Sequence, residues 1–575
     1  MPLWKSAEAQ QATPSTQWYA TPNDHNAAAP QPQQARAVAR DATVRGEAVL
    51  LDSIAATHAR DGAARSSGAS CWSGYTPPAD ALFTKGDAIT IQQAMLQAAI
   101  DIIPGVAAKR PEAAGTLEAL GKALTRQLDV LTPKATDTTP LNDGDVMERI
   151  TPKSLPATLY GQIEATAGLP KDSLRTEWKD QYIRNTSNKT PWVPIEHAIE
   201  LGNAPVVSRC TPLNSAFGPQ YGPEGKDYGQ TGLCSMTPRL SASFRDPLKE
   251  NLRVTNCWVT ELVDSTTDTT VFCALRSGAL AGKFTGDVNK GVQATVAREN
   301  AQELLEAAIL QDIKQHPDTA HGDRVINLVS IDLMSARQEG SKVAHQEEAL
   351  AEAAKYINAN GISMRLPRED GSSEVVHVRP TVQCHTFRAG VNNLGKLTIS
   401  QGPANKEAFR EFLKVYNDHK AAHPEASHAL DDALVADIKA KLGQGHSYEM
   451  PAKLATLAFR SGCQVHFNCK SGKDRTGMMD AESKLFASQM HQADQKGATA
   501  LPPYEFKDAD PRRADLHRLI FEGGNMDITR MNTGARGLKI APVPKLDQDL
   551  IKRLGGEETL LWVQGGKRYT NIDDM

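Results

Sequence analysis

The stretch HFNCKSGKDRTGMMDAE, residues 466–482, is the most informative part of this chain of 575 residues, because it indicates both a local fold and a candidate site. QVHFN, residues 464–468, has the composition of a short strand, and the pattern that follows Gly477 through Met479 and Phe486 is typical of a helix. Between the two lie a cysteine, two lysines, an aspartate and an arginine. We therefore predict a strand–loop–helix unit with a tight loop over residues 470–474.

This loop has the composition of a phosphate site. A cysteine and an arginine separated by five residues are weak evidence alone, but a loop that leads into a helix points backbone N–H groups at an anion. Gly472 lets the backbone approach a phosphate closely. Arg475 can hold two phosphoryl oxygens through its planar guanidinium, and the same positive surroundings favour the nucleophilic thiolate of Cys469.

The remaining side chains of the loop fit phosphoryl transfer. Thr476 can donate a hydrogen bond to the thiolate, and Asp474 is the nearest candidate for the acid that protonates the departing alkoxide and then activates water. The alternative for Asp474 is a salt bridge within the loop. Lys470 and Lys473 favour a substrate with more than one phosphate, such as a polyphosphorylated inositol ring, unless they are merely solvated. The predicted substrate-binding residues are Lys470, Ser471, Gly472, Lys473, Thr476 and Gly477.

Two other kinds of site are disfavoured. Cys463, His466 and Cys469 are spaced like metal ligands, but on a strand these positions alternate between faces and a fourth ligand is missing. A nucleotide-binding P-loop would need its glycine, lysine and hydroxyl in a different order. We expect neither a metal nor another cofactor.

The composition limits the possible binding partners and the cellular compartment of the protein. The formal charge of −4 gives no global attraction to nucleic acid or to an anionic membrane. The 8 cysteines are scattered without a Cys-x-x-Cys pair, which favours reduced thiols. We see no apolar run of about 20 residues that could span a bilayer, and the N-terminus lacks the pattern of a cleaved signal peptide.

The chain divides into three predicted regions, and we expect a mixed α/β (α+β) fold. Residues 1–45 have the composition of a disordered tail, residues 46–200 form a mainly helical domain, and residues 201–575 form a phosphatase domain of the cysteine-dependent α/β type. Residues 205–245, rich in Gly, Pro and Ser, suggest a long loop or a boundary. A hairpin is predicted to follow, with its turn at residues 264–268.

Two helix starts are predicted in the second half of the chain. Asn405 is placed to cap the helix that contains Phe409 and Phe412, and Ser427 is placed to cap the next one.

NCKSGKDRTGM, from Asn468 to Met478, resembles the active-site loop of the SopB/SigD/IpgD family, which are inositol phosphate phosphatases injected by bacterial type III secretion. The loop is related to that of eukaryotic inositol polyphosphate 4-phosphatases. A second family motif, approximately Asn-Phe-Gly-Val-Asn-Glu, is matched only at its centre by residues 390–392. Its acidic position is Asn393 here, so no carboxylate role can be assigned to that position, and Asp474 becomes the stronger candidate for the general acid. Residues 523–537, the hairpin near Trp258 and, more loosely, residues 200–540 also resemble the family.

The resemblance implies a bacterial effector that acts in the cytoplasm and at membrane surfaces of a host cell. Its substrates would be phosphoinositides such as phosphatidylinositol 4,5-bisphosphate and soluble inositol polyphosphates, with a 4-phosphatase the implied type. A secretion chaperone and a host Rho-family GTPase would bind the helical region, and no nucleic acid is expected.

Three alternative functions stay open. The phosphocysteine can be intercepted by a ring hydroxyl, which would make the enzyme a phosphotransferase or isomerase. A protein tyrosine phosphatase is disfavoured because Asn468 stands where such loops usually have histidine. The chain can also act chiefly as a GTPase-binding module.

Overall fold

The computed structural model describes most of the chain between residues 75 and 565. The described residues are 75–78, 81–141, 154–187, 193–217, 254, 256–280, 290–319, 324–334, 336–367, 373–391, 402–442, 448–469, 472–507, 510–533, 536–538 and 548–565. The predicted tail at residues 1–45 lies outside them, as do Lys470, Ser471, Asn392 and Asn393.

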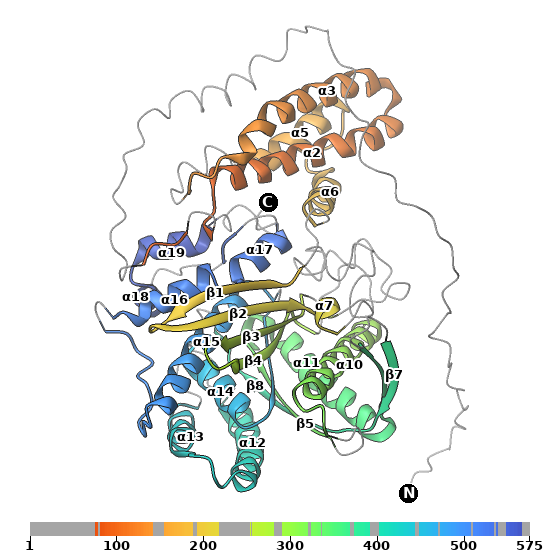
Figure 1. Ribbon diagram of the computed structural model, residues 1–575. Helices are drawn as coiled ribbons and strands as arrows, with labels where there is room; N and C mark the ends of the chain where they lie inside the picture. The colour runs from red at the N-terminus through yellow and green to blue at the C-terminus, as the bar shows by residue number, and fades with distance from the viewer. Residues whose placement is uncertain are drawn as a thin grey trace, which may run out of the picture. The chain divides into compact units, whose positions relative to one another are not determined.

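Four helices near the N-terminus pack around a core of their own, as predicted for this stretch (Figure 1). They are α2 (Lys85–Lys109), α3 (Ala114–Leu131), α5 (Leu155–Thr166) and α6 (Arg175–Ser187). The first begins at a capping box, in which Thr84 Oγ1 accepts from the Asp87 N–H and the Asp87 carboxylate accepts from the Thr84 N–H. Trp178 and Tyr182 stack inside this core, with ring centroids 5.5 Å apart.

A seven-stranded sheet follows, with the strand order β1-β2-β3-β4-β9-β5-β8. Its strands are β1 (Ile195–Leu201), β2 (Ala204–Pro212), β3 (Trp258–Asp264), β4 (Thr269–Ser277), β5 (Val325–Asp332), β8 (Thr381–Arg388) and β9 (Gln464–Asn468). Strands β1 to β4 form an antiparallel meander, and β9, β5 and β8 run parallel to β4. The predicted hairpin is therefore confirmed as β3–β4, and the predicted strand before the loop as β9.

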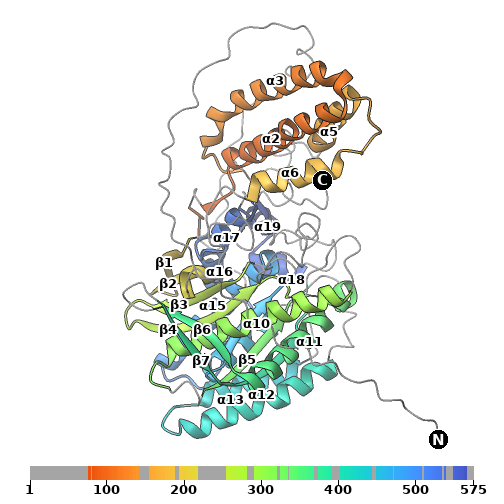
Figure 2. The ribbon, with the colours of Figure 1, turned by 90° about the vertical axis from the view of Figure 1, so that its right-hand side faces the viewer.

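Helices cover both faces of the sheet (Figures 1 and 2). Helices α10 (Lys290–Gln315) and α11 (Ala336–Asn360) share a core with one face. The core on the other face includes side chains of α12 (Gly402–Ala422), α13 (Ala429–Lys441), α14 (Glu449–Arg460), α15 (Asp474–Gln495) and α16 (Arg512–Phe521). The smaller elements are α7 (Leu213–Phe217), β6 (Ile362–Pro367), β7 (Ser373–Val378), α17 (Asn525–Thr533), α18 (Gln548–Leu554) and α19 (Glu557–Gln564). Within the described residues, we find no helix with both the length and the apolar character needed to cross a membrane.

The structure differs from the sequence predictions at the entry to the sheet. The predicted domain boundary between residues 200 and 201 falls inside β1, so the sheet takes its first strand from the stretch assigned to the helical region. The expected loop at residues 205–245 begins instead with β2, whose buried positions alternate with partly exposed ones. Strand β2 pairs with β3 on one side and with β1 on the other, so pairing with distant strands stabilises this stretch as sheet.

Both predicted helix caps are wrong. Asn405 lies inside α12, where its side chain bonds the backbone N–H and C=O of Arg388 at 2.9 and 2.8 Å. It thereby satisfies the outward-facing peptide groups of the edge strand β8. Helix α13 begins after His428 without a side-chain cap, so Ser427 does not serve as one.

Candidate active site

The candidate site lies where four parallel strands end together. Ser277 at the end of β4 is in register with Asn468 at the end of β9. Asn468 is in turn in register with Asp332 of β5, and Asp332 with Arg388 of β8. The segments that follow these four residues therefore meet at the carboxyl edge of the parallel strands, which is the usual place for a ligand in an open α/β sheet.

Cys469 is the first residue after β9 at this edge. It is a free cysteine with 2% of its surface exposed. The backbone just before it is fixed to β5, because the Leu333 N–H donates to the Asn468 carbonyl at 2.9 Å. Helix α15 begins at Asp474, so the predicted strand–loop–helix unit is confirmed. The thiol thus lies between a rigid strand and a helix N-terminus.

Gly472 brings the loop into close contact with the end of β4. Its φ of +68° belongs to the left-handed region. A methyl group at this position would lie 2.5 Å from the Gly278 nitrogen and 2.6 Å from the Ser277 carbonyl carbon. The close approach of the β4 backbone therefore requires glycine at this position, and the predicted approach to a phosphate stays a prediction.

The Gly472 carbonyl is held against β3 and β4. Asn256 Nδ2 donates to it at 2.8 Å and Arg276 Nη2 at 3.4 Å. A trans peptide places its N–H opposite its carbonyl, so the Lys473 N–H points away from these donors. The loop thus presents an N–H group rather than a carbonyl on its other side, which is the arrangement that an anion needs.

Arg475 is anchored to the strand next to the cysteine. Its Nη1 donates to the Leu333 carbonyl at 3.0 Å, just beyond the end of β5. The side chain is partly buried in the first turn of α15, as is that of Asp474. The structure therefore brings Arg475 and Asp474 to the same sheet edge as Cys469.

The other predicted loop residues differ in their surroundings. Lys473 and Thr476 are buried, and the Thr476 hydroxyl has no hydrogen-bond partner in the described part of the chain. That hydroxyl is thus available to a thiolate or a phosphate. Gly477 instead packs against Leu538 and Asn525, which lets residues of the C-terminal segment approach α15.

Tyr448 is a neighbour of the loop that the sequence patterns did not indicate. It precedes α14 and is 9% exposed. Burial raises its pKa well above the ordinary value, with smaller influences from Arg475, Cys469, Glu482 and Asp474. The phenol is therefore neutral and able to donate a hydrogen bond at this edge.

His466 links three strands beneath the loop. Its Nε2 lies 2.9 Å from Ser277 Oγ of β4 and its Nδ1 2.9 Å from Ser330 Oγ of β5. Burial lowers its pKa to about 3, so the ring is neutral. Both ring nitrogens are engaged with hydroxyls, which gives His466 a structural role in place of the metal-ligand role considered for it.

The second motif also reaches the edge. The N–H groups of Ala389 and Gly390 donate to the Asp332 carbonyl at 2.8 and 3.4 Å, directly after β8. Asp332 also places a buried carboxylate here, and its Oδ1 accepts from the Met334 N–H at 2.8 Å. The local sequence does not mark Asp332 as a site residue, because it stands at the end of an apolar strand.

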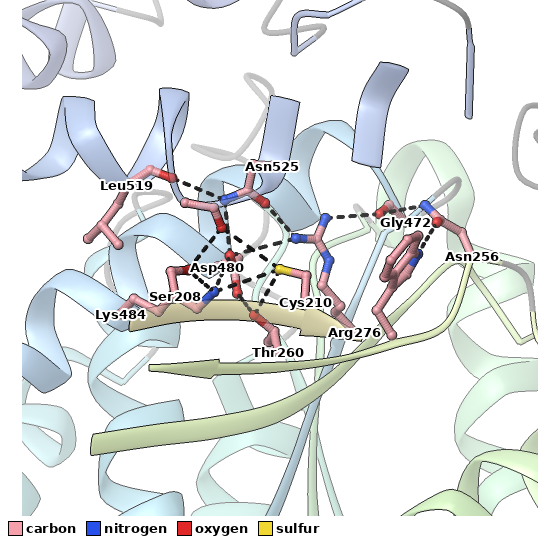
Figure 3. A network of polar contacts seen from close by, with 12 residues as sticks. Ser208, Cys210, Asn256, Thr260, Arg276, Gly472, Asp480, Lys484, Leu519 and Asn525 are labelled. Atoms are coloured by element: carbon pink, nitrogen blue, oxygen red, sulfur yellow. Dashed lines mark hydrogen bonds and ion pairs between the residues drawn. The ribbon is translucent and has the colours of Figure 1, made fainter. Parts of the chain in front are cut away.

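A buried polar network lies behind the loop (Figure 3). Arg276 Nη1 donates to Asn525 Oδ1 at 2.5 Å and lies 3.7 Å from the Asp480 carboxylate. Asp480 also accepts from Thr260 at 2.6 Å, and its ion pair with Lys484 measures 3.2 Å. These residues come from four separate stretches of sequence, so no local pattern could indicate that they meet.

The sequence is similar to those of known proteins. A family model described as "Enterobacterial virulence protein IpgD" matches residues 171–411 and 408–568. The inositol phosphate phosphatase SopB of Salmonella bongori is 27% identical over 422 residues, which cover 67% of this chain and 94% of that protein. The inositol phosphate phosphatase IpgD of Shigella sonnei is 25% identical over 436 residues, covering 70% of this chain and 77% of that protein.

Among solved structures, a Legionella phosphoinositide phosphatase aligns with 81% of this chain and 89% of its own, at 9% identity and a TM-score of 0.49. The family model spans well over half of the sequence and includes the loop, the network residues and the C-terminal helices. The chain therefore belongs to the IpgD family.

Proposed function

We propose that this protein is a cysteine-dependent phosphatase that removes phosphate from inositol polyphosphates and phosphoinositides. The observation that carries the proposal is the position of Cys469 and Arg475 at the carboxyl edge of the sheet, at the two ends of one loop. Within this loop the Gly472 carbonyl points toward Asn256. The names of the curated relatives supply the substrate class.

In the first step the Cys469 thiolate attacks phosphorus. A P–S bond forms while the bond between phosphorus and the ring oxygen breaks. Asp474 donates its proton to the departing oxygen, which leaves as the hydroxyl of the product. Arg475 and the N–H groups at the start of α15 stabilise the charge on the equatorial oxygens.

In the second step water attacks phosphorus and Asp474 accepts a proton from it. The P–S bond breaks, inorganic phosphate leaves and the thiolate of Cys469 is restored. Thr476 assists by donating its hydrogen bond to the sulfur as the negative charge returns.

The substrate carries more than one phosphate, because Lys470 and Lys473 add positive charge beyond what a monoester requires. Phosphatidylinositol 4,5-bisphosphate and soluble inositol polyphosphates meet this condition, and a 4-phosphatase is the expected type. Ser471 and Gly477 complete the set of loop residues proposed to form the substrate site.

The family description, a virulence protein of enterobacteria, supports a role as an effector delivered into host cells. We propose type III secretion as the route. A secretion chaperone and a host Rho-family GTPase are the proposed partners of the helical region.

The test is phosphate release from a panel of phosphoinositides and inositol polyphosphates with isomer-resolved products. The wild type should release phosphate in the presence of EDTA, and Cys469→Ser should reduce the rate by at least about 10⁴-fold, as loss of a covalent nucleophile does. Release that persists in Cys469→Ser would refute the mechanism. Phosphate that moves between ring positions without release would identify a phosphotransferase, and faster turnover of a phosphotyrosine peptide would identify a protein phosphatase.

A further inference from the structure

The buried network of Figure 3 contains Arg276, a residue with a wholly buried guanidinium, directly behind the phosphate loop. Arg276 is the next-to-last residue of β4, two residues before Gly278. One of its nitrogens reaches the Gly472 carbonyl, and another reaches Asn525 at the start of α17. A planar guanidinium can bridge two acceptors in this way, whereas an ammonium group cannot reproduce the fork.

The network fixes the orientation of this guanidinium. Asp480 of α15 lies 3.7 Å from it and is itself held by Thr260 at 2.6 Å and by Asn525 Nδ2 at 3.0 Å. Lys484, one turn further along α15, lies 3.2 Å from Asp480 and donates to Ser208 Oγ at 2.9 Å. Each of these side chains is fully buried, so the arrangement has little freedom to change.

The charges of the network do not cancel. Burial raises the pKa of Asp480, but the charges of Lys484 and Arg276, with hydrogen bonds from Thr260 and Asn525, lower it overall. The carboxylate is therefore ionised. Burial also raises the pKa of the neighbouring Cys210 thiol, which is then neutral. Two cations thus face one anion among the described residues of this network, and one positive charge is left over in a medium where charge is poorly screened.

We propose that Arg276 is a positioning residue of the phosphate loop. Its hydrogen bond holds the Gly472 carbonyl so that it points away from the bound phosphate. Its guanidinium also places the excess positive charge of the buried network next to the loop. The bound phosphate supplies the missing negative charge. The proposal rests on the proposed function, because it assigns the charge to the anion of that reaction.

The proposal predicts weaker binding of anions by Arg276→Gln. Affinity for vanadate should fall by about tenfold or more, together with kcat/KM for phosphoinositide, because the Gly472 carbonyl is no longer held away from the anion.

Arg324→Gln is the matched control. Arg324 is also a buried arginine, 1% exposed, paired with one aspartate (Asp312) at 2.6 Å. It precedes β5, about 26 Å from the catalytic edge at the ordinary rise of a strand. The control should lose stability but keep the vanadate affinity of the wild type.

The outcomes decide between positioning and mere support of the fold. A vanadate affinity in Arg276→Gln equal to that of Arg324→Gln would overturn the proposal. Should Arg276→Gln fail to fold, Arg276→Lys decides, because it keeps the charge but not the planar guanidinium that bridges two acceptors. It should bind vanadate about tenfold more weakly than the wild type, and wild-type vanadate binding would overturn the proposal. A wild type that releases no phosphate would refute the proposed function while leaving the comparison of vanadate binding intact.

Discussion

Replacing Gly472 with alanine tests the close approach on which the site depends. The added methyl group would lie 2.5 Å from the Gly278 nitrogen, 2.6 Å from the Ser277 carbonyl carbon and 2.9 Å from the Ser277 oxygen. All three neighbours are backbone atoms at the end of β4, a central strand, so they cannot rotate away. The loop itself must move outward, and it takes the Gly472 carbonyl away from Asn256.

Two terms set the size of the effect. A non-glycine residue in the left-handed region costs about 1–2 kcal/mol of stability. The clash also displaces the loop, because the distance from the methyl carbon to the Gly278 nitrogen must increase from 2.5 Å to more than 3.0 Å, the shortest separation that such carbons show. A misplacement on the order of 1 Å in an active site lowers the rate about 100-fold, which is about 2.7 kcal/mol of barrier. We therefore expect a moderate loss of stability and a large loss of kcat/KM.

Gly497→Ala separates these two terms. Gly497 follows the other end of α15, has a φ of +65°, and a methyl group there would meet nothing within 4 Å. This variant should lose a similar 1–2 kcal/mol or so in chemical denaturation but release phosphate from a short-chain phosphoinositide at the wild-type rate. Wild-type kcat/KM in Gly472→Ala, or an equal loss of activity in Gly497→Ala, would refute the argument that the approach to β4 sets the geometry of the loop.

Two further predictions concern stability. Burial lowers the pKa of His466 to about 3 from 6.5, so the unfolded chain binds the additional proton between these values and stability falls as the pH drops below about 6.5. His466→Gln should remove about 1.4 kcal/mol per pH unit from the slope of unfolding free energy between about pH 6 and 4, and unchanged slopes would contradict this. Arg553 is buried between aromatic rings and pairs with the buried Glu482 at 2.6 Å. Arg553→Met should therefore destabilise the protein by about 3–5 kcal/mol, whereas Arg410→Ala on the surface should change little, and equal denaturation midpoints for the two would be inconsistent with the buried pair.

The core of the site could be predicted from sequence because its determinants are local. The strand QVHFN, the glycine in the loop and the helical pattern after Gly477 lie within about thirty residues, and each follows from a preference of short range. The spacing of Cys469 and Arg475 then places both at one end of that unit. The structure confirms the unit and adds the strand to which Arg475 is anchored.

The parts that were missed depend on pairing between distant residues. The register that pairs β2 with β3 joins residues about fifty positions apart. Asn405 is predicted to be a helix cap from its local sequence. In the structure its side chain forms two hydrogen bonds with the backbone of Arg388 in β8, which no local pattern indicates. Tertiary contacts therefore decided these positions against local preference.

The network behind the loop joins the segments outside the loop that resemble the family. Residues 523–537 had no predicted role, yet Asn525 bonds both Arg276 and Asp480 and so connects α17 to the loop carbonyl. Trp258 Nε1 donates to Asn256 Oδ1 at 2.7 Å, and Asn256 is the second donor to Gly472. The hairpin, the loop and the C-terminal segment thus act on the same peptide group. Since the buried guanidinium, amide and indole would each lose a partner if one of them were replaced alone, these segments are expected to constrain one another in sequence, although they lie up to 269 residues apart between Asn256 and Asn525.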